Sequence, residues 1–480
     1  MTQLSSLLPI GFKTSADPLV TGLAIDHRKI TSGNIFGAFV GERVNGEDYI
    51  PAAIAAGANV IVARPEARVD GAVHVASDNP RQLFAQMAAR YFPQFPGTCA
   101  AVTGTNGKTS IVEMTRQLWR MAGFHAASIG TLGITTGDDR VVTGLTTPDV
   151  VTFLANMAGL AAEGVTHAAF EASSHGLHQY RTEGLPVQIG AFSNLSHDHL
   201  DYHQTMDAYF DAKMRLFREV VVDGGAAVIW ADDPRSGQVA DIARARGLQM
   251  MTVGAQGDDL RLMDRQVTAL GQMLQLRHLG KDYTVSLPLI GGYQVANALV
   301  SAGIVMASGQ DIGRTLADLE RLQPVRGRLE RAGISRAGAP IYVDYAHTPD
   351  ALGAALDALR PHAEGRLILV FGAGGDRDQA KRPEMGHVAA AKADVQIITD
   401  DNPRGEDPAA IRAAIAAGAP DALIIGDRRQ AISQAIAMAG GQDIVCIAGK
   451  GHEQGQIIGA GADVRVIPFD DVSVARECAA

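Results

Sequence analysis

The sequence AVTGTNGKTS occupies residues 101–110 and sets the architecture of the chain around it. The apolar run that ends at Val102 predicts a buried parallel strand, and the glycine-rich turn after it leads directly into a predicted helix. In such a loop, backbone N–H groups and the positive end of the helix face a phosphate group. Lys108 then reaches the terminal phosphates, and the Thr109 hydroxyl binds Mg²⁺. The loop predicted to bind the phosphates of a nucleotide comprises Gly104, Thr105, Asn106, Gly107, Lys108, Thr109 and Ser110.

This loop departs from the strict phosphate-binding pattern, which has glycine where the chain has Val102. A plain turn before a helix is the alternative interpretation. The apolar strand before the loop and the helix after it both lie where phosphate binding needs them. The sequence therefore favours a variant P-loop.

Length and charge limit the classes of protein and partner. A chain of 480 residues is too long for one hydrophobic core, and about 150 residues per domain predicts three domains. Hydrophobic residues make up 46% and charged residues 20%, which is typical of a folded soluble protein. With 42 basic and 52 acidic residues, the net charge of −10 argues against non-specific nucleic-acid binding and against an anionic membrane surface.

Cysteine spacing and the amino terminus predict the compartment. Cys99, Cys446 and Cys478 lack metal-site spacing and fit a reducing environment. The first residues lack the basic run and apolar core of a signal peptide, and no window reaches about 18 uninterrupted apolar residues. We expect a cytoplasmic protein that does not insert into membranes.

Strands that alternate with helices predict an α/β fold in all three parts of the chain. Residues 1–90 form a small α/β domain, with strands over 34–40 and 58–63 and a helix over 49–56. Residues 91–324 form a central P-loop domain with a mostly parallel sheet and a β-rich excursion over 262–287. Residues 325–480 restart the alternation and predict a doubly wound, Rossmann-like sheet.

Two segments of the central domain contain candidate metal ligands. Glu171 ends an apolar strand, where a carboxylate can face Mg²⁺, although a solvated loop acid is the alternative. The segment SNLSHDHLDYH places His197, Asp198, His199, Asp201 and His203 close together. A zinc site is conceivable, but oxygen-rich surroundings beside a P-loop favour Mg²⁺, with a single histidine as ligand.

A lysine lies on the apolar side of the helix that follows this segment. At 100° per residue, one face of the predicted helix carries Met206, Tyr209, Phe210, Met214, Leu216 and Phe217, and Lys213 falls in its middle. A lysine in that position extends its ammonium to the surface, pairs with an acid, or has lost its charge. The sequence leaves these three alternatives open.

Polar segments follow successive strands of the last domain, where ligands bind in such sheets. Cationic and acidic side chains together suit a substrate that carries both carboxylates and amines. For each residue alone, a surface charge is the alternative. The residues expected to converge are Arg377, Asp401, Asn402, Arg404, Lys450, His452 and Glu453.

Motifs along the whole chain carry a family resemblance. In order they read TGTNGKTS, TTPD, EASSHGLHQYR, SNLSHDHLDYH, GRLE, DYAHTPDAL, GAGGDRDQAKRP, DDNPR and GKGHE. With them the sequence resembles the Mur ligases, ATP-dependent enzymes that form amide bonds in peptidoglycan precursor synthesis. The motifs are most similar to those of the member that adds meso-2,6-diaminopimelate to UDP-N-acetylmuramoyl-L-alanyl-D-glutamate through an acyl phosphate.

The resemblance implies a role for each domain and for matching residues. Residues 1–90 would bind the UDP-muramoyl substrate, 91–324 would bind ATP, and 325–480 would bind the incoming amino acid. Lys108, Glu171, His199 and Lys213 would be catalytic; Thr109, Glu171, His199 and Lys213, as a carbamate (N6-carboxylysine), would bind Mg²⁺. The implied ATP contacts beyond the loop are Asn297, Arg328, Asp344 and His347. The implied contacts to the UDP-linked dipeptide are Asp26, His27, Arg28, Thr146, Thr147, Ser173, Gln179 and Arg181.

The resemblance also implies a diaminopimelate pocket formed by Arg377, Asp401, Asn402, Pro403, Arg404, Gly449 and Glu453. Diaminopimelate has a second carboxylate that lysine lacks, and Arg404 can bind it in a bidentate pair. Two positions depart from the family pattern, which usually has serine at His27 and asparagine at Gln294. We expect a monomer whose partners are these small-molecule substrates. Rival interpretations are a lysine-adding family member, a folylpolyglutamate synthetase and a P-loop ATPase that is not a ligase.

Overall fold

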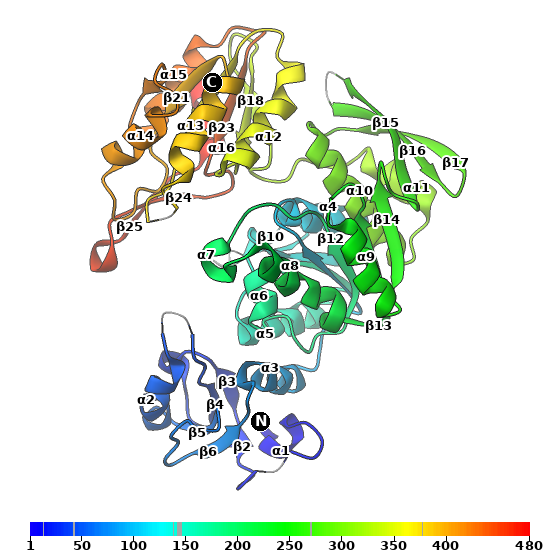
Figure 1. Cartoon of the computed structure of the whole chain (residues 1–480), viewed down its shortest axis with the longest axis vertical. Helices are drawn as coiled ribbons and strands as arrows, with labels where there is room; N and C mark the ends of the chain where they lie inside the picture. Colours follow the sequence, from blue (N-terminus) through cyan, green and yellow to red (C-terminus); the bar gives the residue numbers. More distant parts are fainter. Residues whose placement is uncertain (13, 42–43, 138, 142–145, 269–270, 377) are drawn as a thin grey trace. The chain divides into compact units, whose positions relative to one another are not determined.

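The computed structural model describes the chain except residues 13, 42–43, 138, 142–145, 269–270 and 377 (Figure 1). The fold has two compact units. The first contains Met1–Leu262, Arg277–Lys281 and Asn297–Asp318, and the second contains Met263–Leu276, Asp282–Ala296 and Leu319–Ala480. Both are built from sheets covered by helices, so the predicted α/β fold class is confirmed.

The amino-terminal part of the first unit is a four-stranded parallel sheet with the order β3-β4-β5-β6. Its strands are β3 Gly22–Ala24, β4 Asn34–Gly37, β5 Ala58–Ala63 and β6 Val73–Ala76, and a further pair is formed by β1 Thr2–Gln3 and β2 Leu19–Val20. Its helices are α1 Leu4–Leu7, α2 Ile50–Ala55 and α3 Pro80–Tyr91.

Two elements of this part of the chain are shorter than predicted. The strand predicted over 34–40 ends at Gly37, because Val40 makes an isolated bridge to Asn45. The helix predicted over 49–56 covers Ile50–Ala55 and follows a 3₁₀ turn.

The central sheet places the P-loop strand in the middle. Its order runs β10-β9-β8-β11-β7-β12-β13-β14, and all pairings from β8 to β14 are parallel. The strands are β7 Thr98–Thr103, β8 Ala126–Gly130, β9 Gly133–Thr136, β10 Asp139–Val141, β11 His167–Glu171, β12 Val187–Phe192, β13 Val221–Trp230 and β14 Gln249–Gly254. The predicted β-rich excursion is confirmed as β15 Leu260–Thr268, β16 Gly271–His278 and β17 Lys281–Leu287.

Helices around this sheet begin at the residues that helix chemistry predicts. Asp149 caps α5 through the N–H groups of Val151 and Thr152, and Thr205 caps α8 through the N–H of Ala208. The helices are α4 Lys108–Met121, α5 Val150–Ala162, α6 Ser174–His178, α7 Leu200–His203, α8 Met206–Arg215, α9 Ser236–Ala245, α10 Gly292–Ala307 and α11 Ile312–Leu319. The helix predicted directly after the P-loop is therefore confirmed.

The second unit contains the predicted doubly wound sheet, with the order β18-β19-β23-β20-β21-β22. Every pairing is parallel except that of β18 with β19. Along β20, Leu369 packs with α12, α13 and α14 on one face and Val370 packs with α15 and α16 on the other, which is the period-two pattern of a strand buried on both sides.

The strands of this unit are β18 Glu330–Ile334, β19 Pro340–Asp344, β20 Leu367–Phe371, β21 Val395–Ile398, β22 Leu423–Ile424 and β23 Ile444–Ala448, with an outlying hairpin of β24 Gly455–Ile458 and β25 Arg465–Pro468. Its helices are α12 Pro349–Leu359, α13 Lys381–Lys392, α14 Pro408–Ala416, α15 Arg428–Met438 and α16 Asp471–Ala479.

An ion pair joins the amino ends of β20 and β23. Arg366 donates from Nη2 to Asp443 Oδ2 at 2.7 Å, and this contact lowers the pKa of Asp443 to about 2. The unfolded carboxyl binds its proton near pH 4, so the stabilisation is present above that pH and is lost as the pH falls toward 2. We expect Asp443→Asn to cost about 1 kcal/mol at pH 7, because a partly exposed pair is lost, and less at pH 2.5. Chemical denaturation at both pH values measures this, and an equal loss at both would contradict it.

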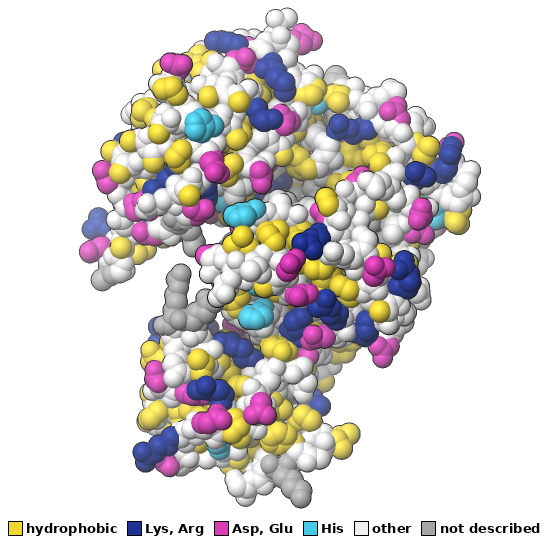
Figure 2. Space-filling model, viewed as in Figure 1, with side chains coloured by type: hydrophobic (Ala, Val, Ile, Leu, Met, Phe, Trp, Pro, Cys, Tyr) yellow, Lys and Arg dark blue, Asp and Glu magenta, His cyan; other side chains and the backbone are white. Residues whose placement is uncertain are grey.

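The surface carries charges of both signs. Figure 2 shows acidic and basic side chains interspersed on the face that it draws. Within the described ranges, no helix is both long and apolar enough to cross a membrane.

Candidate active site

Close packing of the P-loop requires glycine at two positions. Gly104 has a φ of +147°, and an added Cβ would lie 1.9 Å from Ser193 Oγ. Gly107 has a φ of +87°, and its Cβ would lie 2.4 Å from Asn297 Oδ1. Both backbone conformations are costly for other residues. The structure thus places Asn297, a predicted ATP contact, directly against the loop.

Residues after β12 hold the other side of the loop. Ser193 Oγ donates to the Asn106 carbonyl at 2.6 Å, and Asn194 Oδ1 accepts from the Asn106 N–H at 2.9 Å. The Thr105 N–H donates to the Asn194 carbonyl at 2.8 Å. Ser193 and Asn194 were not predicted from the sequence as supports of the P-loop. The available signal was their place at the end of a buried strand, but the pairing of β12 with β7 was not readable from the sequence.

Two lysines converge on one carbonyl oxygen of the loop. Lys108 Nζ donates to Gly104 O at 2.9 Å and to Thr105 O at 2.7 Å. Lys213 Nζ donates to the same Gly104 oxygen at 2.7 Å from α8. Helix α8 therefore brings its apolar-face lysine to the phosphate loop, 109 residues away in the sequence.

The environment of Lys213 decides between the three alternatives. The residue is 1% exposed, so the ammonium does not extend to the surface. The described residues place no carboxylate in an ion pair with it, and its amine lies 4.3 Å from the centre of the Tyr209 ring. Burial, together with the neighbouring Lys108 ammonium, holds the pKa of Lys213 well below its ordinary value. Both effects shift the equilibrium of Lys213 toward the uncharged amine. The rest of the predicted apolar face is buried, except that Met206 is half-buried.

Glu171 ends β11 beside the P-loop strand, in register with Val102. Its side chain is buried, so the solvated loop acid of the alternative interpretation is excluded. Oε1 accepts from the Thr131 N–H at 2.7 Å. An added Cβ on Gly130 would lie 2.2 Å from that oxygen, so the next strand allows the carboxylate to lie close to its backbone.

The predicted dipeptide contacts of the central domain lie together at the ends of β11 and α6. Thr147 Oγ1 donates to the Glu171 carbonyl at 2.9 Å and bonds Ser173 Oγ at 3.0 Å. Arg181 Nη1 donates to the Thr147 carbonyl at 2.8 Å, and its Nη2 donates to Gln179 Oε1 at 2.7 Å. The fifth predicted contact, Thr146, bonds Thr131 through its hydroxyl at 3.0 Å.

Aromatic and imidazole rings gather next to this group. His175 lies 4.9 Å from the His199 ring and 5.5 Å from the His203 ring, and its closest ring neighbour is Tyr202 at 4.1 Å. Burial and the neighbouring His199 lower the pKa of His175 to about 4, so this ring is uncharged near neutral pH. Within the described part of the chain, no group of three or more His, Cys, Asp or Glu side chains is arranged to hold a metal ion, so the choice between zinc and Mg²⁺ stays a prediction.

The predicted uridine-side contacts lie in the 3₁₀ turn that follows β3 of the amino-terminal sheet. Asp26 and Arg28 make a bidentate ion pair, with Nη2 to Oδ2 at 2.8 Å, and Arg28 lowers the pKa of Asp26 to about 2. His27 stacks on Tyr49 with ring centres 4.5 Å apart. His27, which stands where the family usually has serine, therefore packs against an aromatic ring.

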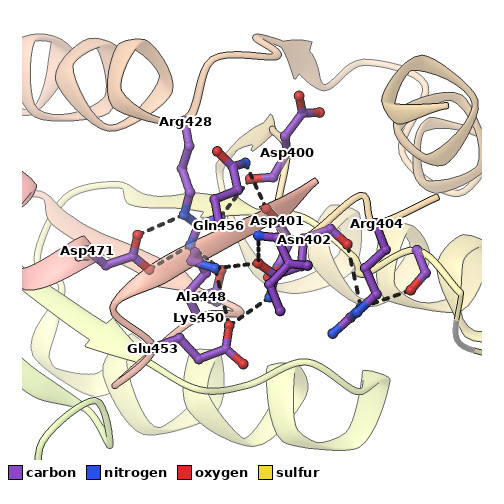
Figure 3. A network of polar contacts seen from close by, with 12 residues as sticks. Asp400, Asp401, Asn402, Arg404, Arg428, Ala448, Lys450, Glu453, Gln456 and Asp471 are labelled. Atoms are coloured by element: carbon purple, nitrogen blue, oxygen red, sulfur yellow. Dashed lines mark hydrogen bonds and ion pairs between the residues drawn. The ribbon is translucent and has the colours of Figure 1, made fainter. Parts of the chain in front are cut away.

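Part of the predicted amino-acid pocket forms a connected polar group (Figure 3). Asn402 Nδ2 donates to Glu453 Oε2 at 2.7 Å, and Lys450 Nζ donates to Asn402 Oδ1 at 2.9 Å. An added Cβ on Gly449 would lie 2.6 Å from Asp401 Oδ2. Asn402 is only 2% exposed, whereas the Glu453 side chain is 31% exposed. Glu453 therefore presents the accessible carboxylate of this group.

Arg404 lies at the edge of the same group. Its φ is +51°, and its Nη1 donates to the Gly375 carbonyl at 2.8 Å. Within the described residues its Nε and Nη2 have no protein partner, so one side of the guanidinium can bind a ligand. Pro403 precedes it and is buried. The predicted contact Arg377 lies outside the described residues.

The remaining predicted ATP contacts lie together in the second unit. Asp344 accepts from the N–H groups of Leu329 and Ala346, at 2.7 and 2.8 Å, and burial raises its pKa to about 6 although Arg328 opposes the shift. The Arg328 guanidinium lies 4.6 Å from the centre of the Tyr345 ring. The Tyr345 carbonyl also contacts His347 Nδ1 at 2.9 Å.

Comparisons with known proteins agree with this arrangement. Family models match in order: "Mur ligase family, catalytic domain" over residues 19–97, "Mur ligase middle domain" over 102–305, and "Mur ligase, glutamate ligase domain" over 327–451. The chain belongs to the Mur ligase family. It is therefore an ATP-dependent enzyme that forms an amide bond, with a three-domain α/β architecture. The predicted boundaries after residues 90 and 324 stay predictions.

Individual relatives of this Mur ligase cover nearly its whole length. A protein of Zymomonas mobilis subsp. mobilis named UDP-N-acetylmuramoyl-L-alanyl-D-glutamate–2,6-diaminopimelate ligase is 58% identical over 95% of this chain and 94% of its own. A protein of Bradyrhizobium diazoefficiens with the same name is 52% identical over 94% and 93%. A solved structure described by that name has a TM-score of 0.72 and 32% identity, and the match covers 99% of this chain and 98% of the other.

Proposed function

We propose that this Mur ligase adds meso-2,6-diaminopimelate to UDP-N-acetylmuramoyl-L-alanyl-D-glutamate in peptidoglycan precursor synthesis. Relatives at 58% and 52% identity that bear the name of this enzyme support the choice of substrates. The observation that carries the reaction type is the convergence of Lys108 and Lys213 on the Gly104 carbonyl. A P-loop that only hydrolyses ATP has no need of a second buried amine at that point.

The chemistry proposed for the site has two steps. The terminal phosphate of ATP, oriented by the P-loop and Lys108, is transferred to the γ-carboxylate of the D-glutamyl residue and leaves ADP. An amine of diaminopimelate then attacks the acyl phosphate, loses a proton, and displaces inorganic phosphate to form the amide bond. The protein mainly positions the reactants and stabilises charge, as is usual in phosphoryl transfer.

Lys213 is proposed to act as a carbamate. Carbon dioxide reacts with an uncharged amine, and burial beside Lys108 favours that form of Lys213. The reaction replaces a potential cation beside Lys108 with an anion, so repulsion between like charges becomes attraction.

Oxygen donors beside the loop fit Mg²⁺. The buried Glu171 carboxylate lies at the end of the strand next to the P-loop strand, and the Thr109 hydroxyl lies in the first turn of α4. These residues, with His199 and carbamylated Lys213, are proposed to hold the metal. When bound, Mg²⁺ offsets the negative charge of the phosphates and polarises them for transfer.

Arg404 and Glu453 are proposed to select the amino acid. Glu453 presents a carboxylate that suits an amine, and Arg404 keeps one side of its guanidinium available for a carboxylate. Lysine would leave that guanidinium unpaired, and a site built for a polar group rejects ligands that lack it by up to about 10⁴-fold. Asn402 is proposed to orient Glu453, since its amide is already bonded within the protein.

The predicted substrate preference can be tested by phosphate release. With ATP and the UDP-linked dipeptide present, meso-diaminopimelate is expected to support turnover at least about 10²-fold more efficiently than L-lysine. Turnover with lysine at an equal kcat/KM would refute the substrate assignment. ATP hydrolysis that does not depend on any amino acid would refute the ligase assignment.

The location and assembly follow from the proposed reaction. ATP and a UDP-linked sugar peptide are intracellular metabolites, so we infer that the enzyme acts in the cytoplasm. A monomer is proposed as the active species.

A further inference from the structure

An ion pair that no step of the proposed reaction uses is completely buried in the second unit. Arg428 and Asp471 are the first residues of α15 and α16, and both side chains are 0% exposed. Arg428 Nε donates to Asp471 Oδ1 and its Nη2 donates to Oδ2, both at 2.7 Å. Burying two charges costs free energy unless each is fully bonded. The stability of the fold alone therefore does not explain why this ion pair is buried.

The remaining donors of Arg428 reach the ends of two strands. Its Nη2 also donates to the carbonyl of Ala448 at 3.0 Å, and its Nη1 donates to the carbonyl of Asp400 at 3.4 Å. Ala448 is the last residue of β23 and precedes GKGHE, whereas Asp400 begins DDNPR after β21. Figure 3 shows the guanidinium between Asp471 and these two segments.

The local position of Arg428 is unfavourable for its own helix. A cation in the first turn faces the positive end of the helix dipole, where an acid is preferred. Burial also disfavours the charge, but Asp471 and Asp401 hold the pKa of Arg428 above its ordinary value. The contacts of Arg428 with Asp471 and with the two strand-end carbonyls therefore outweigh the free-energy cost of a cation in the first turn of α15.

The two segments that Arg428 joins carry the polar group of the amino-acid pocket. Segment 400–404 supplies Asn402, and segment 449–453 supplies Lys450 and Glu453, which bond Asn402 at 2.9 and 2.7 Å. These two hydrogen bonds of Asn402 can form only if the distance between the two segments does not change. Arg428 fixes that separation because it binds backbone carbonyls at the start of the first segment and directly before the second. Its side chain is 0% exposed and does not reach the surface of the pocket.

We propose that Arg428, held by Asp471, is a positioning residue that sets the register of segments 400–404 and 449–453 for binding of the incoming amino acid. This inference rests on the proposed function for the identity of that amino acid. A lysine at 428 keeps the charge but cannot make a bidentate carboxylate pair and reach two carbonyls. In that variant, the side chains of segments 400–404 and 449–453 would be misaligned for the amino acid. The proposed sites for ATP and for the UDP-linked substrate would be unchanged.

The test compares two arginine–aspartate pairs in one domain. Arg428→Lys alters the pair at the carboxyl ends of the strands, and Arg366→Lys alters the pair at their amino ends, in which Nε and Nη2 both donate to Asp443 Oδ2. Phosphate-release kinetics are measured with each of the three substrates varied in turn. We expect Arg428→Lys to raise KM for the amino acid about tenfold or more with KM for ATP unchanged, and Arg366→Lys to change neither.

A double variant separates positioning from folding. Arg428→Met with Asp471→Leu removes both charges, so it leaves no unpaired buried ion, but it also removes both carbonyl contacts. We expect a folded protein with the same rise in KM for the amino acid. An amino-acid KM within twofold of wild type in a folded Arg428→Lys or double variant would overturn the inference, as would an equal rise in all three KM values.

Hydrogen exchange gives a readout that does not depend on the substrate. The amides of segments 400–404 and 449–453 are expected to exchange faster in Arg428→Lys than in wild type and unchanged in Arg366→Lys. If wild type uses another amino acid, the proposed substrate is wrong and the KM of that amino acid is measured instead. If no amino acid supports turnover, the proposed function fails, and unchanged exchange in Arg428→Lys would overturn the positioning role independently.

Discussion

Lys213→Met is expected to reduce amino-acid-dependent ATP turnover by at least about 10²-fold, because it removes the carbamate proposed to stabilise charge at the phosphates. Methionine keeps the length of the buried side chain and cannot react with carbon dioxide. Methionine also leaves no unpaired buried polar group at this 1% exposed position, so the variant is expected to fold. Phosphate release and thermal unfolding of the same preparation measure the two effects.

The role of the carbamate can be separated from the loss of the side chain. Lys213→Ala leaves space at a position that is 1% exposed, and a short carboxylate such as formate or acetate can enter it. We expect partial recovery of turnover in the alanine variant and none in the methionine variant, which fills the space. Turnover above about a tenth of wild type in a folded Lys213→Met protein would refute the carbamate role.

Gly104→Ala is expected to lower ATP turnover at least about 10²-fold by displacing the P-loop, since an error of about 1 Å in position can have that effect. The added Cβ would lie 1.9 Å from Ser193 Oγ and 3.1 Å from the backbone of Asn194. The same carbonyl group also binds Lys108 and Lys213. KM for ATP and kcat are both expected to change.

A matched glycine isolates the steric part of this effect. Gly123 has a φ of +94° and nothing within 4 Å of an added Cβ, so Gly123→Ala introduces backbone strain alone. We expect it to cost about 1 kcal/mol of stability without changing KM for ATP. Adding Ser193→Ala to Gly104→Ala removes the closest clash and is expected to recover part of the activity. Normal turnover by Gly104→Ala alone would contradict the tight packing of the loop.

Local patterns in the sequence predicted most of the fold. The alternation of strands and helices, the strand and glycine turn before α4, and the apolar face of α8 depend on residues only a few positions apart. Strand ends were also predictable, which brought Asn402 and Glu453 into one candidate site. The errors were at element ends, as at β4, where the pairing of Val40 with Asn45 replaces the strand.

The sequence could not predict which strand ends lie next to each other. Ser193 and Asn194 support the P-loop because β12 pairs with β7, and this pairing joins segments almost 90 residues apart. Arg428 was not selected at all, since neither a motif nor periodicity marks an arginine whose partner is 43 residues away. Such contacts depend on strand order and on how helices cross the sheet.

Lys213 shows what the sequence could predict and what only the tertiary structure could decide. Helical periodicity alone placed it on an apolar face and so established that its charge was a problem. Three solutions remained open, because the surroundings of a side chain depend on elements far away in the sequence. The tertiary structure placed its amine on the Gly104 carbonyl beside Lys108, where burial and a neighbouring cation disfavour protonation. The sequence thus determined that Lys213 lies on an apolar helix face, and the packing of α8 against the P-loop decided which groups surround its amine.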